Sequence, residues 1–337
     1  MNRAARARQF LTDAGWSGAA QSVVAGDASN RRYDRLTLGG KTAILMDAPP
    51  EKGEDVRPFI TVTKLLQARG LSAPDIYAAD EAGGFLLLED LGDAVFARVL
   101  EAEPQLENRL YFTAIDVLVH LHAAPAPALP PYDTAMMTDR ALLAFDWYQK
   151  AATGRVDDGA RRDAEVAISN VLEPLSASVL IQRDYHAENL IWLPERDGVA
   201  RVGLLDYQDA MLGHPAYDLC SILLDARRDV PATTQDAMLA RYLDAVQIVD
   251  RAGFMRDYHA LSLQRNLRIV GVFTRLCVRD GKAHYVDLLP RVWGYVEQAL
   301  DRLGDQDLAE LIRRALPAPT PEICKRIKAQ CATPPTP

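Results

Sequence analysis

The sequence predicts an α+β fold in which a small antiparallel sheet comes first and a larger, mainly helical part follows. Short strand-like segments joined by tight turns fill the N-terminal region, whereas apolar residues at helical spacing dominate after residue 101. Later in the chain, two apolar runs flank an Asp-Gly pair and are bordered by polar side chains. The 337 residues, 49% of them apolar, are long enough to form two lobes.

The N-terminal region predicts one helix and then strands. Apolar residues at helical spacing predict a short amphipathic helix from Arg3 that ends at Gly15. Three strands are expected next, at residues 21–26, 31–38 and 41–47. Because short turns join them, we expect antiparallel pairing. The apolar run within residues 83–93 is bounded by glycines and predicts a further buried strand with an acidic exit.

The rest of the chain is predominantly helical in pattern. The helical segments are residues 110–122, 139–150, 163–172, 215–224, 235–249, 254–277, 284–303 and 308–316. His120 and His122 suggest a metal site only weakly, since residues two apart on a helix face different directions, and structural roles are favoured. The Pro-rich residues 317–337 predict a disordered or loosely docked tail.

Composition excludes several function classes. The net charge of −8 argues against nucleic-acid binding, which needs clustered Lys and Arg. The four cysteines show no C-x-x-C spacing and predict reduced thiols. No apolar run reaches transmembrane length, and the N-terminus lacks the apolar core of a signal peptide. We therefore expect a cytoplasmic enzyme without a membrane partner.

Residues 179–210 carry the candidate chemistry. Asp197-Gly198 lies between two apolar runs, which is a strong hairpin signal. With these two residues as the loop, Asn189 and Asp206 become a directly opposed cross-strand pair. Opposed residues share one face of a sheet with Cβ atoms about 4.5–5.5 Å apart. Both side chains can then bind one hard cation through oxygen.

Asp184 adds a carboxylate to this pair. It lies five residues before Asn189, in a polar segment that follows the apolar residues 179–181 and is expected to be a loop at a strand end. A carboxylate that accepts a hydroxyl proton beside a Mg²⁺ site is the minimum apparatus for phosphoryl transfer. The sequence thus predicts Asp184 as the catalytic base and Asn189 with Asp206 as the metal ligands.

Three motifs in this order resemble those of the aminoglycoside-phosphotransferase and choline-kinase-like small-molecule kinases. Residues 182–189, QRDYHAEN, resemble the catalytic loop H-x-D-x-x-x-x-N with Gln182 in place of the His. Residues 206–208, DYQ, resemble the later D-x-x metal motif. Residues 213–220, GHPAYDLC, resemble G-x-P-x-Y-D-L-A, and the resemblance implies that Asp218 holds the backbone of the catalytic loop.

The resemblance implies a bilobal protein-kinase-like fold with ATP and Mg²⁺ as cofactors. The implied parts are a nucleotide-binding lobe over residues 1–92, a catalytic and substrate lobe over residues 93–316 and a Pro-rich tail over residues 317–337. Backbone groups at Glu89 and Leu91 would bond adenine. Gly26 and Ser29 belong to the loop that would cover the phosphates.

Met46 is a departure from this family. The third strand should carry a Lys for the α and β phosphates, paired with a Glu on the following helix, but Met46 stands there and residues 57–69 contain no acid. Either other cations neutralise the phosphates or the protein is a nucleotide-binding pseudoenzyme. We favour the first, because the predicted base and both metal ligands are present. The candidate cations are Arg31, Arg32 and Arg35.

Further stretches are similar to the bacterial cell-wall amino-sugar kinases, over about Arg6 to Leu303. These stretches are residues 26–33, 46–50, 86–93 and 264–268. That family uses ATP to phosphorylate the anomeric hydroxyl of N-acetylmuramate and N-acetylglucosamine. Its sugar 1-phosphates feed a nucleotidyltransferase in peptidoglycan recycling, so the resemblance implies an amino-sugar substrate.

The resemblance also implies substrate contacts from the catalytic loop and the C-terminal helices. The candidates are Tyr185, His186, Gln208, Asp209 and Arg265. Arg265 would suit the lactyl carboxylate, since a guanidinium binds carboxylates bidentately, although a helix-surface charge is the alternative. Another hydroxyl substrate, an amino alcohol, a homoserine-like acid or an aminoglycoside, stays open. A cationic drug would call for an acidic pocket, and no dense acidic cluster follows Asp206.

Overall fold

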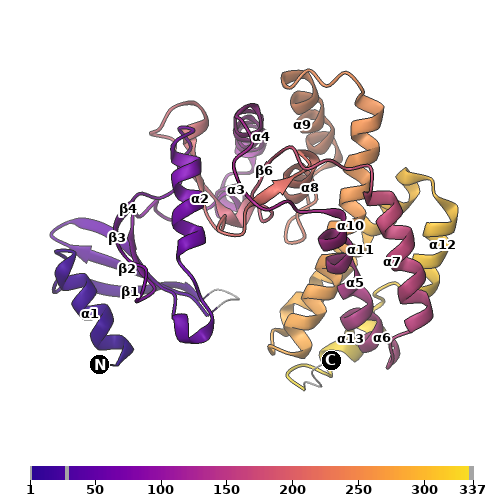
Figure 1. The fold of residues 1–337 in the computed structure, drawn as a ribbon, viewed down its shortest axis with the longest axis horizontal. Coiled ribbons are helices and arrows are strands. Elements are labelled where there is room, and N and C mark those ends of the chain that lie inside the picture. Colours follow the sequence, from indigo (N-terminus) through magenta and orange to yellow (C-terminus); the bar gives the residue numbers. More distant parts are fainter. Residues whose placement is uncertain (1, 27–29, 334–337) are drawn as a thin grey trace. The chain divides into compact units, whose positions relative to one another are not determined.

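The structure is a computed structural model that describes residues 2–26 and 30–333. Its contacts divide the chain into two compact units, Met1–Ala124 with Gln182–Ala210, and Pro125–Ile181 with Met211–Pro337. The first unit contains an antiparallel sheet and the second is mainly helical (Figure 1), so the predicted α+β fold class is confirmed. The lobe boundaries at residues 92 and 316 stay a prediction, since they concern nucleotide and substrate binding.

The sheet of the first unit has five antiparallel strands in the order β1-β2-β3-β5-β4. They are β1 (Ala20–Gly26), β2 (Arg32–Leu38), β3 (Lys41–Asp47), β4 (Ile76–Asp80) and β5 (Phe85–Leu88). Four of them match the expected strands. The edge strand β4 was not expected, because its Ala-Ala-Asp end has low strand propensity and a bulge between Ile76 and Ala78 interrupts its ladder.

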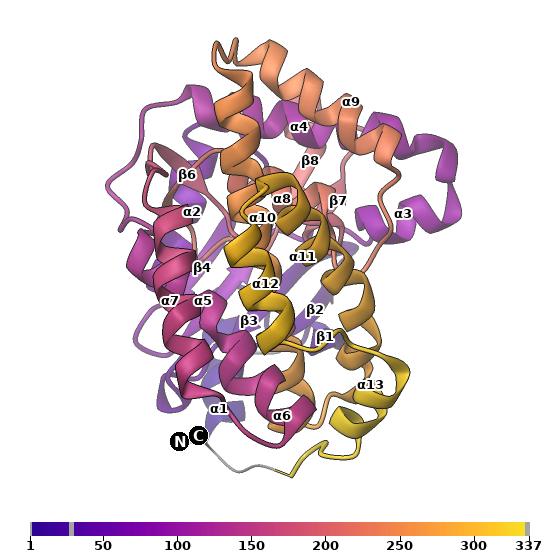
Figure 2. The same cartoon turned by 90° about the vertical axis from the view of Figure 1, so that its right-hand side faces the viewer.

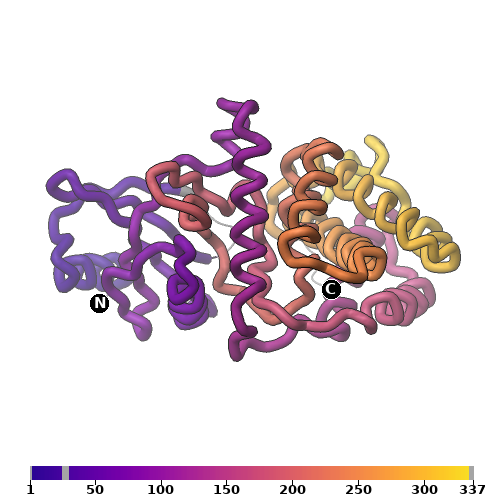
Figure 3. Tube along the Cα trace, turned by 90° about the horizontal axis from the view of Figure 1, so that it is seen from above, coloured from indigo at the N-terminus to yellow at the C-terminus, as the bar shows by residue number. Residues whose placement is uncertain are grey.

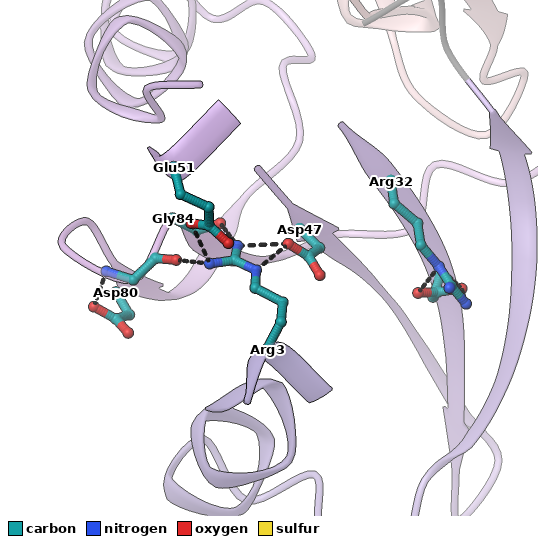
Figure 4. Close-up of polar contacts among 8 residues, drawn as sticks. Arg3, Arg32, Asp47, Glu51, Asp80 and Gly84 are labelled. Carbon is teal, nitrogen blue, oxygen red and sulfur yellow. Dashed lines mark hydrogen bonds and ion pairs between the residues drawn. The ribbon is translucent and has the colours of Figure 1, made fainter. Parts of the chain in front are cut away.

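The helix α1 (Arg3–Asp13) covers one face of this sheet. Its Phe10 and Leu11 pack on a buried cluster formed by three strands. The cluster residues of the strands are Leu36, Ala43, Leu45, Phe85 and Leu87. Arg3 fixes the start of the helix, because its Nε donates to Asp47 Oδ1 at 2.8 Å (Figure 4). Its guanidinium lies 3.9 Å from the centroid of the Phe85 ring. We therefore call this the α1 face.

The opposite face of the sheet lies on the side of α2 (Arg57–Gln67), as Figure 1 shows. Tyr33, Met46 and Leu86 stand side by side across β2, β3 and β5. They alternate with the residues of the α1 face, so they point to the α2 face. Met46 is therefore a buried apolar residue on the face where a strand-borne lysine was expected.

The first unit also contains two helices and a small hairpin. They are α3 (Phe96–Ala102), α4 (Glu107–Ala123), β7 (Leu190–Trp192) and β8 (Val202–Leu204). The loop between β7 and β8 contacts α4 (Figure 3). On α4, the His120 Nε2 atom lies 2.7 Å from the Arg69 carbonyl oxygen, which is the structural role that the sequence favoured for this histidine.

The second unit is built around the long helix α10 (Arg251–Val278), which contacts α5, α8 and α11 (Figure 2). Its other helices are α5 (Thr134–Leu143), α6 (Lys150–Thr153), α7 (Asp158–Leu172), α8 (Ala216–Leu223), α9 (Ala232–Ala245), α11 (Leu289–Leu303) and α12 (Gln306–Ala315). A two-stranded sheet pairs β6 (Val179–Ile181) with β9 (Met211–Gly213). Among the described helices, α10 included, none has the length and apolarity to cross a membrane.

Gly271 allows α10 to approach α5 closely. A Cβ atom at this position would lie 2.3 Å from the backbone carbon of Leu143, the last residue of α5. Any larger residue would force the two helices apart. The four cysteines of the chain, all in this unit, are free thiols, as expected.

The prediction of a disordered or loosely docked tail was wrong over residues 317–333. The helix α13 (Pro321–Lys328) forms there and contacts α6 and α10 (Figure 2). Thr320 caps it by accepting a hydrogen bond from the Ile323 N–H, and Pro321 begins the first turn. Ile327 is fully buried. The high proline content obscured a short, capped amphipathic helix.

We predict that Ile327→Ala lowers the free energy of unfolding by about 2–5 kcal/mol, the usual cost of truncating a buried isoleucine. Chemical denaturation of the full chain measures this. Lys325→Ala, an exposed change on the same helix, is the control and should alter the value by no more than about 0.5 kcal/mol. Equal stability of both variants and the parent protein would contradict the docking of α13.

Candidate active site

The hairpin predicted around Asp197-Gly198 forms, but its register differs by one residue from the prediction. The observed pairs are Leu190 with Leu204, Ile191 with Gly203 and Trp192 with Val202. The connection spans residues 193–201 and contains a 3₁₀ turn, Gly198–Arg201, instead of a two-residue turn. Asp197 has φ −107°, whereas a two-residue type I′ turn needs a positive φ there.

Asn189 and Asp206 nevertheless come together, although they are not a cross-strand pair. Asn189 faces Leu205, whose N–H donates to the Asn189 carbonyl at 3.0 Å. Asp206 lies beyond the end of β8 and has φ 55°, a left-handed conformation that breaks the alternation of the strand. The Asn189 Nδ2 atom lies 3.5 Å from Asp206 Oδ2. Because Asp206 is in this left-handed conformation, its side chain lies near Asn189 even though the strand register differs by one residue from the prediction.

The loop that carries Asp184 is fixed at several points. Asn189 Nδ2 donates to the Asp184 carbonyl at 2.9 Å and lies 3.4 Å from Nε2 of the buried His186. Tyr185 is buried, and its hydroxyl donates to the Ala114 carbonyl of α4 at 2.8 Å. This placement makes Tyr185 an anchor of the loop and argues against a substrate contact through its hydroxyl.

The residues after Asp206 join the site to α2. Gln208 Nε2 donates to Asp206 Oδ1 at 2.7 Å. Tyr207 is buried, stacks on Phe59 of α2 with ring centroids 5.0 Å apart, and shares a 2.8 Å hydrogen bond with the Thr63 hydroxyl. Burial raises the pKa of Tyr207, so the phenol stays protonated. The sequence analysis missed this contact; its signal was the spacing of Phe59 and Thr63 on one helical face.

Asp209 and Arg183 border the site on its exposed side. Asp209 is exposed, and its carbonyl accepts a hydrogen bond from Arg183 Nη1 at 3.2 Å. Arg183 itself has φ 73°, an uncommon conformation for a residue with a side chain. The left-handed residues Arg183 and Asp206 thus immediately precede Asp184 and Tyr207, and strained backbone of this kind recurs at functional sites.

Asn189 and Asp206 suit a hard cation. Because Asn189 Nδ2 donates to the Asp184 carbonyl, the amide oxygen is the atom that can bind a metal. Within the described chain, no group of three or more His, Cys, Asp or Glu side chains forms a metal cluster. Mg²⁺ at nucleotide sites needs only one or two carboxylates besides phosphate and water. An amide oxygen and a carboxylate fit that requirement.

The predicted adenine-binding segment is braced by polar contacts. The Glu89 N–H donates to the Asp75 carbonyl at 2.8 Å, and its carboxylate pairs with Arg196 at 2.5 Å. The Glu89 N–H is thus engaged, and only its carbonyl is suited to adenine. The Leu91 N–H makes no backbone hydrogen bond within the described residues. The Glu89 carbonyl could thus accept a hydrogen bond and the Leu91 N–H could donate one, and their contact with adenine stays a prediction.

The three candidate arginines lie in different surroundings. Arg35 pairs with Asp90 and Asp93, both at 2.7 Å, and the hydrogen bonds that its guanidinium donates to Asp93 and Asp90 raise its pKa. Arg32 pairs with Asp34 at 2.8 Å on the α1 face, where its side chain is 61% exposed (Figure 4). Arg31 pairs with Glu54 at 2.8 Å. Of the predicted phosphate loop, Gly26 ends β1, and Ser29 lies outside the described residues.

In the second unit, Arg265 and Asp218 are both buried. Arg265 is 4% exposed, and its Nη2 donates to Ser221 Oγ at 2.8 Å. Its Nε and Nη1 atoms are buried without a hydrogen-bond partner in the described part of the chain. The alternative of a helix-surface charge is therefore wrong. Asp218 is fully buried on α8, and its predicted contact with the catalytic loop stays a prediction.

Comparison with known proteins identifies the family of the chain. The chain matches the phosphotransferase enzyme family over residues 21–262. It is 40% identical to an N-acetylmuramate/N-acetylglucosamine kinase of Caulobacter vibrioides over 92% of this chain and 94% of that protein. It is 32% identical to a kinase of the same name from Pseudomonas putida, over 86% and 87% of the two chains.

A solved structure supports the fold. A choline kinase from Streptococcus pneumoniae superposes with a TM-score of 0.61 over 89% of this chain and 98% of that one, at 12% identity. At that identity the likeness concerns the fold alone. The resemblance stated from the three motifs is confirmed by these findings. The chain belongs to the phosphotransferase enzyme family.

Proposed function

We propose that this protein is an ATP-dependent kinase that phosphorylates the anomeric hydroxyl of N-acetylmuramate and N-acetylglucosamine. The observation that carries the proposal is the 40% identity with a kinase named for these two sugars, over more than nine-tenths of both chains. The pair Asn189 and Asp206, joined to the loop of Asp184, supports phosphoryl transfer.

Asp184 is the base in this proposal. Its carboxylate takes the proton of the C1 hydroxyl while the sugar oxygen bonds to the γ-phosphorus and the bond from that phosphorus to the β-phosphate oxygen breaks. The products are the sugar 1-phosphate and ADP. Mg²⁺ held by Asn189 and Asp206 would neutralise charge on the phosphates. The hydrogen bond from Asn189 to the Asp184 carbonyl keeps base and metal ligand in one arrangement.

The nucleotide contacts are proposed at two places. The Glu89 carbonyl accepts from the adenine amino group, and the Leu91 N–H donates to a ring nitrogen. Gly26 and Ser29 belong to the loop over the phosphates. Arg32 is a poor phosphate ligand, because it lies on the α1 face with Asp34, and Arg35 is engaged by two carboxylates.

Arg265 is proposed to bind the lactyl carboxylate of N-acetylmuramate. A buried guanidinium with two unpartnered nitrogens among the described residues is costly unless an anion or water satisfies them. A carboxylate accepts two parallel N–H bonds from a guanidinium. His186, Gln208 and Asp209 remain proposed sugar contacts. We place the reaction in the cytoplasm, where ATP is available, and ahead of a sugar-1-phosphate nucleotidyltransferase.

We predict ATP- and Mg²⁺-dependent turnover of both N-acetyl sugars, with phosphorus NMR placing the phosphate on C1. Methyl N-acetylglucosaminide, whose anomeric oxygen is blocked, should not react. Asp184→Asn should lower kcat by about 10²–10⁴-fold, because the base is lost, while ATP binding persists.

Phosphate on another hydroxyl would contradict the anomeric assignment. Turnover of choline, homoserine or kanamycin in place of the sugars would favour the other hydroxyl kinases considered above. ATP binding without turnover of any acceptor would favour a pseudoenzyme.

We predict that Arg265→Ala lowers kcat/KM for N-acetylmuramate about 10- to 100-fold relative to N-acetylglucosamine, since only the former carries the carboxylate and a charged hydrogen bond contributes about 1.5–3 kcal/mol. The ratio of the two sugars on one variant is insensitive to partial misfolding. Arg268→Ala, on the same helix and bonded to the Tyr217 hydroxyl, is the control. An unchanged ratio in Arg265→Ala would remove this residue from the sugar site.

A further inference from the structure

Glu54 binds two consecutive residues just before β2, Asn30 and Arg31. It follows the 3₁₀ turn Pro50–Lys52 and precedes α2. Its Oε2 atom accepts from Arg31 Nε at 2.8 Å, and its Oε1 atom accepts from the Asn30 N–H at 3.1 Å. The side chains of Arg31 and Glu54 are only 12% and 13% exposed. Ion pairs this shielded from water hold their geometry better than exposed ones.

Arg31 contacts Tyr33, which lies on the same face of the sheet as Met46. Burial lowers the pKa of Arg31, but its contacts with Tyr33 and Glu54 raise the pKa by more, so the guanidinium keeps its charge. Tyr33 is the residue directly opposed to Met46 across β2 and β3. Arg31 therefore contacts Tyr33, the residue opposed to Met46, and Met46 stands where the third strand of the similar kinases carries its lysine.

The same face leads to the metal motif. Tyr207 stacks on Phe59 and shares a hydrogen bond with Thr63, and both of these residues belong to α2, the helix that Glu54 precedes. Tyr207 follows Asp206 directly in the chain. The segment formed by Glu54 and α2 thus contacts both Arg31 and the residue next to Asp206, whereas Arg32 points to the α1 face (Figure 4).

The other two arginines are engaged differently. Arg35 is shared by two carboxylates, Asp90 and Asp93, which together outweigh its single charge. Arg32 pairs with Asp34 on the α1 face, with its side chain 61% exposed. Arg31 pairs with the carboxylate of Glu54, as a lysine pairs with a glutamate in the similar kinases.

We propose that Glu54 is a positioning residue that holds Arg31 as the cation for the ATP phosphates, in place of the lysine–glutamate pair that Met46 precludes. Glu54 fixes the guanidinium through Nε and the start of β2 through the Asn30 N–H. A guanidinium fixed in this way binds phosphate oxygens without losing further side-chain entropy. This inference rests on the proposed use of ATP but not on the identity of the sugar.

Nucleotide affinities measured by calorimetry without any sugar test the proposal. Arg31→Ala should weaken ATP and ADP about 10- to 100-fold, the range for a lost hydrogen bond between charged groups, and leave adenosine unchanged. Glu54→Gln should weaken ATP by a smaller factor. Because Glu54 acts through Arg31, the double variant should bind ATP no more weakly than Arg31→Ala alone. Arg32→Ala, the adjacent arginine, is the matched control and should bind ATP normally.

Adenosine affinity reports whether each variant is folded. Should Arg31→Ala lose adenosine binding, Arg31→Gln, which keeps a polar but uncharged side chain, replaces it. An unchanged ratio of ATP to adenosine affinity in the Arg31 variant would overturn the proposal. Additive losses in the double variant would overturn the role of Glu54. Normal ATP binding by the parent protein without sugar phosphorylation would instead refute the proposed sugar substrate and leave this inference standing.

Discussion

One side-chain amide connects the parts of the candidate active site. Asn189 Nδ2 donates to the Asp184 carbonyl and lies within 3.5 Å of Asp206 Oδ2, so a single group relates the predicted base to the predicted metal ligand. The amide oxygen is then left for a cation. Neither an aspartate nor a leucine at this position could donate and accept at once. The relative positions of Asp184 and Asp206 therefore depend on an asparagine.

The helix α2 connects this site to the sheet. At its start, Glu54 holds Arg31 and Asn30, and along its length Thr63 and Phe59 hold Tyr207. The hydrogen bond between Thr63 and Tyr207 contributes about 0.5–1.5 kcal/mol by itself. A buried Tyr207 phenol without this partner would cost more free energy than the bond contributes, so the bond also fixes the position of Tyr207. Movement of α2 would thus alter both Arg31 and Asp206.

The helices and strands could be predicted from the sequence more accurately than the contacts between them. Periodicity and glycine positions predicted four of the five sheet strands and the helical pattern of the second unit up to residue 316, because those signals are local. Sequence reasoning failed on the hairpin register, since the φ of Asp197 depends on how the loop packs on α4. It failed on α13, whose docking through Ile327 is a tertiary contact. Glu54 was missed because the acid was sought within α2, whereas it precedes the helix and meets a residue 23 positions away.

The central claim is that the anomeric oxygen of the sugar attacks the γ-phosphorus at the site formed by Asp184, Asn189 and Asp206. N-acetylglucosamine labelled with ¹⁸O at C1 tests it most directly, with phosphorus NMR and mass spectrometry of the product. The account predicts that the label is retained in the bridge between C1 and phosphorus, which gives an isotope shift of the phosphate signal. A phosphate ester that lacks the label, or that carries the phosphate on another carbon, would contradict the account.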